Sequence, residues 1–417
     1  MVFIAASAAV GIVASCSSPG DSGGAGPVDA GVESSAANDG SMVDAGAPDS
    51  APPLDAAPFD GGPLPIVCGS PPCAVSLTTT TPGFVDGFDE GFCALMNDRT
   101  VACWGANGVG QLGRGADAGA SSANPERVAG LTDVVRLEHT CALDQSGASW
   151  CWGRGAFLQD DAGGITIERT PVRLALPGAT SVSVAGGVGC AAVDGGVLCW
   201  GSNDRGQIAP FDVAPRTATL GPHSVALPPG APVRDVVTGP ATFAWREDGT
   251  VLSWGANRML ARASSLDPDP YPRPVDLPGV ATVDFAPFEA CAAYAGLGYC
   301  WSSERPGLPE PFALSEPIVQ IATAPKRWCA VTASGAVYCR GVNSSGQAGD
   351  GTKEHAYEAV EVKGLPAAAV EVRTTPTTTC VLSTNGKVYC FGANHRGQLG
   401  NRVFKVPSLV PGEVVLP

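Results

Sequence analysis

Residues 93–113 read CALMNDRTVACWGANGVGQLG, and this stretch decides the fold. It places a cysteine, a short polar turn and a second cysteine before Trp-Gly, and a glycine-rich run follows. The chain contains seven copies of this pattern, which begin at Cys93, Cys141, Cys190, Phe243, Cys291, Cys329 and Cys380. A period of about fifty residues is typical of a β-propeller in which each repeat forms one four-stranded blade.

The two cysteines of a copy are predicted to face each other across a β-hairpin. They lie ten residues apart in most copies and nine apart in two, which implies hairpin loops of three and two residues. Three-residue loops favour glycine at the third position. The copies place there Gly147, Gly249, Gly335 and Gly386, with Arg99 as the exception. The two-residue loops are Asp194-Gly195 and Ala295-Gly296.

The fourth copy indicates that these cysteines are disulfide partners, because Phe243 and Ser253 replace both of them together. Reduced core cysteines or a zinc site are the alternatives, but zinc pairs usually lie roughly two to four residues apart, with histidines nearby. We therefore expect no metal, no cofactor and an oxidising compartment. The predicted disulfides are Cys93–Cys103, Cys141–Cys151, Cys190–Cys199, Cys291–Cys300, Cys329–Cys339, Cys380–Cys390 and Cys68–Cys73.

The remaining cysteine, Cys16, follows an apolar leader. Residues 1–15 end in Val13-Ala14-Ser15, and with Cys16 this run resembles the bacterial lipobox. We expect the leader to be removed as a signal peptide and Cys16 to carry a lipid. No Lys or Arg precedes the apolar run, unlike most signal peptides, so an ordinary signal peptide with a chance cysteine is the alternative. No apolar run reaches the roughly eighteen residues of a transmembrane helix.

The segment between the leader and the repeats has a different composition. Residues 16–64 are mostly Ser, Gly, Ala, Pro and Asp, and such a segment cannot bury enough apolar surface to offset its ordering entropy. We expect a disordered tether there and a folded domain over residues 65–417. Residues 1–98 carry twelve acidic and no basic groups, whereas residues 99–417 carry 28 acidic and 25 basic groups. This distribution argues against a nucleic-acid partner.

The repeats resemble a known family. Their motifs Cys-Ala-Leu, Trp-Gly and Asn-x-x-Gly-Gln-Leu-Gly are similar to the regulator-of-chromosome-condensation repeat. The resemblance implies an all-β, seven-bladed propeller with four-stranded blades from about residue 73 to the end. Three copies depart from the pattern: the fourth lacks both cysteines, the fifth has Ser302 after Trp301, and the sixth has Arg340 in place of the tryptophan.

The resemblance leaves several functions open. The leading hypothesis is a non-enzymatic scaffold on the cell surface or in the periplasm, held to the outer membrane or surface only by its lipid, that recognises a protein or a glycan. An envelope hydrolase or lyase with a central-channel site is the alternative, although no catalytic motif is present. Some relatives exchange nucleotide on a small GTPase, but a cytosolic GTPase does not fit a secreted, disulfide-bonded chain.

Two residues and the closure of the ring complete the predictions. His139 occupies a consensus position of the family, which implies a structural role, whereas Trp328 is expected either in the core or exposed. Only residues 73–90 precede the first hairpin, and residues 403–417 follow the last. Because unpaired strand edges are costly, we expect the C-terminal segment to pair into the blade that the N-terminal segment begins.

Overall fold

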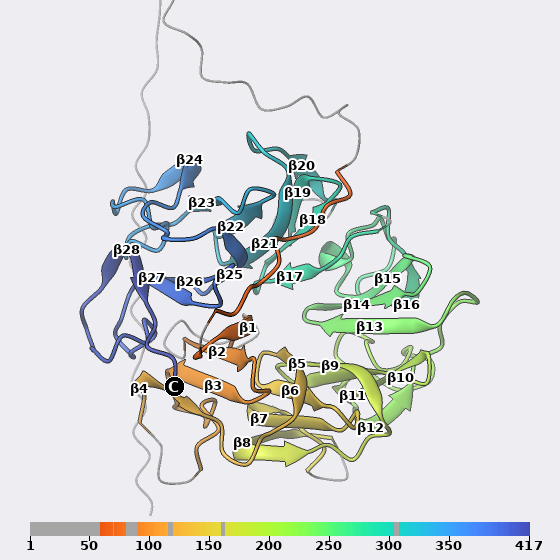
Figure 1. Ribbon diagram of the computed structural model, residues 1–417. Coiled ribbons are helices and arrows are strands. Elements are labelled where there is room, and N and C mark those ends of the chain that lie inside the picture. The colour runs from red at the N-terminus through yellow and green to blue at the C-terminus, as the bar shows by residue number, and fades with distance from the viewer. Residues whose placement is uncertain are drawn as a thin grey trace, which may run out of the picture. The chain divides into compact units, whose positions relative to one another are not determined.

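The computed structural model describes residues 59–69, 71–80, 90–115, 120–159, 163–277, 279–303 and 308–417. These residues form 28 strands in seven antiparallel sheets of four strands each. The sheets stand as blades around a common axis (Figure 1), which confirms the predicted seven-bladed propeller. The leader and Cys16 lie outside the described residues, so their prediction and that of the domain boundaries stay untested.

Each blade consists of four consecutive strands, numbered from the axis outward. The strands are β1 (Ala74–Thr79), β2 (Gly91–Met96), β3 (Val101–Gly105) and β4 (Ser122–Arg127) in blade 1; β5 (Val134–Glu138), β6 (Cys141–Asp144), β7 (Ser149–Ala156) and β8 (Ile165–Arg173) in blade 2; β9 (Ala179–Ala185), β10 (Val188–Val193), β11 (Gly196–Ser202) and β12 (Thr219–Ser224) in blade 3; β13 (Val233–Thr238), β14 (Ala241–Arg246), β15 (Val251–Gly255) and β16 (Asp269–Pro274) in blade 4; β17 (Val283–Phe285), β18 (Glu289–Tyr294), β19 (Leu297–Ser302) and β20 (Glu310–Phe312) in blade 5; β21 (Ile318–Ala324), β22 (Arg327–Thr332), β23 (Val337–Gly341) and β24 (Ala356–Glu361) in blade 6; and β25 (Ala369–Thr374), β26 (Thr378–Ser383), β27 (Val388–Gly392) and β28 (Ser408–Glu413) in blade 7.

The only helix among the described residues is a single 3-10 turn, η1 (Asn257–Met259), in blade 4. Within the same part of the chain, no helix is long and apolar enough to span a membrane.

The antiparallel strands give the ring two different ends. One end carries the short turns between the second and third strands of every blade, and we call it the hairpin end. The other carries the longer loops between the third and fourth strands, and we call it the loop end. Residues 59–64, which the sequence analysis assigned to the tether, lie at the hairpin end, where the Phe59 N–H donates to the Ala295 carbonyl at 3.3 Å.

The hairpins between the second and third strands have the predicted register. Cys93 faces Cys103, the other five cysteine pairs face each other in the same way, and Phe243 faces Ser253. Arg99 adopts a φ of 63° at the loop position where other blades have glycine. In the loop of blade 3, Asp194 and Gly195 have φ values of 50° and 75°, as a type I′ turn requires.

The tryptophans of the Trp-Gly motif pack between blades and not within one. Each is at most 4% exposed, and its indole N–H donates to a backbone carbonyl of the preceding blade. A buried indole with a paired N–H contributes a large apolar area without an unsatisfied donor. The bonds run from Trp104 to Gln398, Trp152 to Gln111, Trp200 to Ala156, Trp254 to Gln207 and Trp301 to Met259, at 2.7–3.1 Å.

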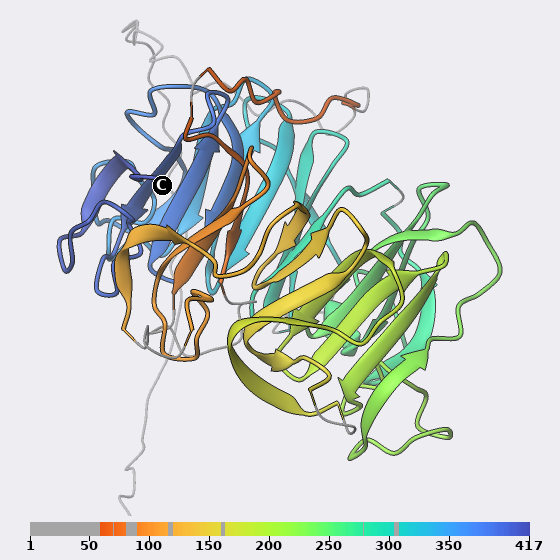
Figure 2. The same ribbon diagram turned by 60° about the horizontal axis from the view of Figure 1, so that its bottom comes forward.

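The ring closes by packing between blades 7 and 1, so the predicted strand exchange is wrong. The C-terminal strand β28 pairs with β27, and β1 pairs with β2. Each repeat supplies all four strands of its own blade, because the short segments at both ends of the domain are long enough for one strand each. Beyond β28, Val414 and Leu416 join Leu77 and Trp104 of blade 1 in one buried cluster. Figure 2 shows these two blades side by side.

Candidate functional site

The structure brings the predicted cysteine pairs together in seven disulfides. In the six hairpins the paired Cα atoms are 4.1–4.2 Å apart. Eleven of the twelve hairpin cysteines are buried, and the exception is the partly exposed Cys300. Seven disulfides are typical of an oxidising, extracytoplasmic compartment.

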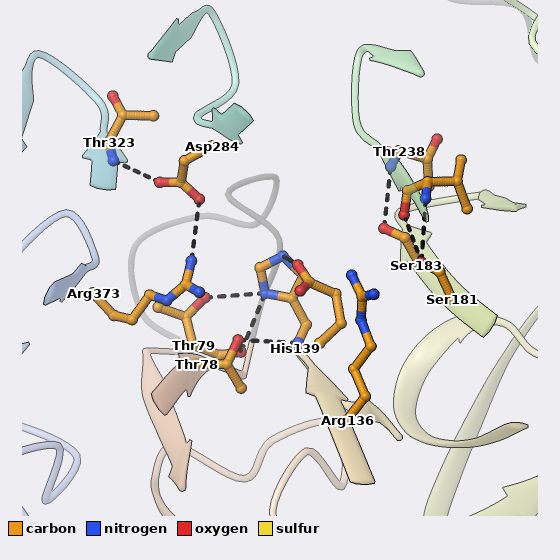
Figure 3. Close-up of polar contacts among 12 residues, drawn as sticks. Thr78, Thr79, Arg136, His139, Ser181, Ser183, Thr238, Asp284, Thr323 and Arg373 are labelled. Carbon is orange, nitrogen blue, oxygen red and sulfur yellow. Dashed lines mark hydrogen bonds and ion pairs between the residues drawn. The ribbon is translucent and has the colours of Figure 1, made fainter. Parts of the chain in front are cut away.

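Polar side chains from the innermost strands line the axis of the ring (Figure 3). The backbone N–H of His139 donates to the Thr78 hydroxyl at 3.0 Å, and its Nδ1 lies 3.1 Å from the Thr79 hydroxyl. These contacts join β1 of blade 1 to the turn after β5 in blade 2. His139 therefore holds two blades together, in agreement with the structural role that the family resemblance implies.

Arg373 links three blades near the axis. Its guanidinium lies 2.6 Å from the Glu371 carboxylate and 3.9 Å from that of Asp284, and its Nε donates to the Leu77 carbonyl at 3.0 Å. Burial raises the pKa of Asp284, while Arg373 and the Thr323 N–H, 2.6 Å away, act in the opposite direction. Burial disfavours the charge of Arg373, but the nearby carboxylates outweigh it and raise its pKa. This network fixes blade 7 against blades 1 and 5.

The described residues enclose a small cavity near the axis. It measures 50 Å³, and its lining includes Arg136 and Asp235, which form an ion pair at 2.6 Å. Ligand pockets usually measure about 300–1,000 Å³. Among the described residues, no three His, Cys, Asp or Glu side chains are grouped to hold a metal ion. The geometry of the axis suits a structural role better than substrate binding.

A much larger cavity, of 570 Å³, opens at the loop end between blades 5 and 6. We call it the blade 5–6 groove. Its lining includes Cys300, Trp301 and Phe312 of blade 5 and Trp328, Arg340 and Tyr357 of blade 6.

The groove lies where the sixth repeat departs from the pattern. Arg340 stands at the tryptophan position, but its side chain is exposed and its Nε donates to the Tyr357 carbonyl at 2.7 Å. It therefore lies along the outer strand β24 and does not enter the space between the blades. The large side chain is on the facing residue, Trp328, whose ring stacks on Phe312 with centroids 4.5 Å apart. The sequence left open whether Trp328 lies in the core or is exposed. The side chain is half-buried, between these two alternatives.

The fifth repeat departs from the pattern at the same junction. In blade 1 the loop between β3 and β4 carries Leu112, which packs in one cluster with Trp152 of the next blade. The corresponding loop of blade 5, residues 303–309, reads SERPGLP and lacks the Gly-Gln-Leu-Gly run. The sequence thus lacks both the tryptophan and the Gly-Gln-Leu-Gly run of the usual contact here, and among the described residues Trp328 packs against the Cys291 cluster of blade 5 instead.

Both departures are visible in the sequence, but the sequence does not show that they meet at one site. The missing information was that each tryptophan packs against the preceding blade, which the spacing of the repeats does not reveal. With that packing rule, the departures at Ser302 in blade 5 and at Arg340 in blade 6 would both have indicated the junction between these two blades.

The repeat and the fold have known counterparts. Residues 377–398 match the family model described as the Regulator of chromosome condensation (RCC1) repeat. The fold is similar to that of yeast RCC1 (Prp20) bound to Kap60, with a TM-score of 0.61 and 19% identity over 75% of this chain and 83% of that chain. This likeness establishes the fold. The protein is a seven-bladed propeller, and residues 377–398 match a repeat of the RCC1 type.

Two curated proteins are similar in sequence. The chain is 34% identical over 162 residues to the E3 ubiquitin-protein ligase HERC2 of Homo sapiens, which is 36% of this chain but 3% of that protein. It is 28% identical over 326 residues to the Ultraviolet-B receptor UVR8 of Arabidopsis thaliana, which is 74% of this chain and 64% of that protein. The chain therefore spans a small part of HERC2 and less than two thirds of UVR8.

The variant Arg373→Met tests the axial network. Methionine removes the guanidinium that neutralises two partly buried carboxylates, so the free energy of unfolding should fall by about 2 kcal/mol at neutral pH. Without Arg373 the pKa of Asp284 rises further. A raised carboxyl pKa gives stability that is present at low pH and lost as the pH rises, so the deficit should shrink in acid. Denaturant titrations at neutral and acidic pH measure both effects.

Lys387→Met is the matched control, because it removes an exposed ion pair with Glu413 and should leave stability nearly unchanged. If the Arg373 variant is as stable as this control, or if its deficit does not depend on pH, the axial network is not the stabilising feature described.

Proposed function

We propose that this chain is a lipid-anchored binding scaffold of the cell envelope, which recognises a partner protein at the blade 5–6 groove. The observation that carries the proposal is the 570 Å³ cavity at one junction of the ring. Its volume is within the range of about 300–1,000 Å³ that is usual for ligand sites. A tryptophan at the Trp-Gly position or Phe391 packs at each of the other six junctions, whereas Arg340 stands at that position here and Trp328 packs there instead.

Two observations support a protein as the partner. Yeast RCC1 (Prp20), whose fold is similar, was crystallised bound to the protein Kap60. The groove also combines aromatic side chains with an arginine, and these residue types are enriched at the energetic centres of protein interfaces. The near-neutral folded domain gives no support to a nucleic-acid partner.

The proposed role is non-catalytic. A hydrolase or lyase at the axis would need carboxylates free to act as acid and base. Among the described residues, Asp235, Asp284 and Glu371 lie beside arginine side chains, Glu138 lies 3.6 Å from His139, and the cavity near the axis measures 50 Å³.

The N-terminal segment suggests how the scaffold is oriented. Phe59 bonds to blade 5, and the Val67 N–H donates to the Thr384 carbonyl of blade 7 at 2.7 Å. Residues 59–69 therefore cross the hairpin end of the ring (Figure 1). We infer that a lipid on Cys16 and the tether that follows it join the ring at its hairpin end, so that this end lies nearer the membrane. The loop end, with the blade 5–6 groove, then faces the partner.

Cys16→Ser should release the protein from the membrane, because the sulfur of Cys16 would carry the anchor. Cell fractionation and detergent partitioning measure the release, and Ser17→Ala, which keeps the sulfur, should stay in the membrane fraction. Membrane retention of the Cys16 variant would contradict the lipid anchor without touching the proposed binding site.

A photocrosslinking amino acid in place of Tyr357 tests the binding site. Tyr357 is 76% exposed at the groove, whereas Tyr271, on β16 of blade 4, is 42% exposed and does not line the groove. With benzoylphenylalanine at either position, irradiation of intact cells should give a discrete protein adduct only from position 357, detected by blotting and mass spectrometry. No adduct, the same adducts from both positions, or a carbohydrate adduct would contradict a protein partner at the groove.

A further inference from the structure

Resting on the proposed function, we infer that the blade 5–6 groove takes one aromatic side chain from an acidic segment of the partner. The partner's ring would pack beside Trp328, against the hairpin disulfide that a ring of the chain itself covers at other junctions. Carboxylates next to that ring would bind the cations at the rim.

The other junctions show what the space between two blades accepts. Trp152 packs in one buried cluster with Cys93 and Cys103 of the preceding blade, and Trp200 packs in the same way with Cys141 and Cys151. An aromatic ring against the preceding hairpin disulfide is thus the recurring solution of this fold.

The groove presents the same surface with only a partial cover, Trp328, which packs against the buried cluster of Cys291. Cys291 and Cys300 line the cavity, and Cys300 is the one hairpin cysteine that is partly exposed. Trp328 and Phe312 form an aromatic wall beside it. An inserted ring would bury this apolar surface, and the gain scales with the area that is removed from water.

Two cations at the rim favour an acidic segment. Within the described residues, Arg340 uses only its Nε, which leaves both terminal amino groups for a carboxylate. The ammonium group of Lys326 has no hydrogen bond or ion pair there. Glu289 and Glu310 also line the groove, but both already have partners. A planar guanidinium with two open N–H groups suits bidentate binding of a carboxylate.

The smallest probe that carries both features is N-acetyltryptophan, an indole with a carboxylate. We expect saturable binding to the intact folded protein, followed by NMR or calorimetry. N-acetyltryptophanamide lacks the carboxylate and N-acetylalanine lacks the ring, so each should bind about tenfold more weakly or not at all. Equal binding of all three, or no saturable binding of N-acetyltryptophan, would overturn the inference.

Three variants locate the probe. Arg340→Gln should weaken binding about tenfold, and Arg340→Trp should abolish it by restoring the chain's own ring. Arg234→Gln removes an exposed arginine from blade 4 and should bind like the unchanged protein. Binding that none of these variants alters would place the probe elsewhere and overturn the inference.

A last binding experiment uses an oligouronate, which offers carboxylates without an aromatic ring. If it binds at Arg340 and N-acetyltryptophan does not, the groove is a site for acidic glycans and the inference is wrong. If the probes fail while benzoylphenylalanine at position 357 still gives a protein adduct, the proposed function stands and only the ligand class fails. If both fail, the proposed function fails as well.

Discussion

The indole of Trp152 lies between two blades, in one buried cluster with the Cys93–Cys103 disulfide, and its N–H donates to the Gln111 carbonyl at 2.9 Å. This contact sets the geometry of the ring. The ring of one blade fills the space beside the hairpin of its neighbour, and the N–H pairs with a buried carbonyl. Because the contact recurs from blade to blade, the ring can close without exchanging strands between its two ends.

At the junction between blades 6 and 7, the corresponding backbone carbonyl is paired although no indole is present. Phe391 fills the space there but has no N–H to donate. The Gln347 carbonyl instead accepts hydrogen bonds from the Arg327 guanidinium at 2.7 Å and the Thr379 hydroxyl at 2.8 Å. Burial lowers the pKa of Arg327 to about 9, although the Glu90 carboxylate opposes the shift. A buried cation thus helps to close this junction, whereas Trp328 covers the junction between blades 5 and 6 only in part.

Sequence reasoning reached the architecture because period and spacing report local geometry. The hairpin register, the positive φ values at Asp194 and Gly195 and the pairing of the cysteines follow from contacts within one repeat. The site depends on contacts between repeats, which no spacing records. The sequence shows that Arg340 replaces the tryptophan of the repeat. Only the packing of each tryptophan onto the preceding blade shows that this replacement leaves Cys300 partly exposed. The error in ring closure has the same origin, since Val414 closes the ring by packing and not by strand pairing.

At the junction between blades 5 and 6, Trp328 covers the hairpin disulfide only in part, and Cys300 stays partly exposed. Mild reduction of the native protein, followed by alkylation and mass spectrometry, measures this directly at each hairpin disulfide. Cys291–Cys300 should open first among the six, because a reductant reaches the partly exposed Cys300 while the other hairpin cysteines are buried. Arg340→Trp should delay its reduction to the rate of the other five. If all six hairpin disulfides open together, or Cys291–Cys300 opens no faster than Cys141–Cys151, the junction is closed in solution and the account is wrong.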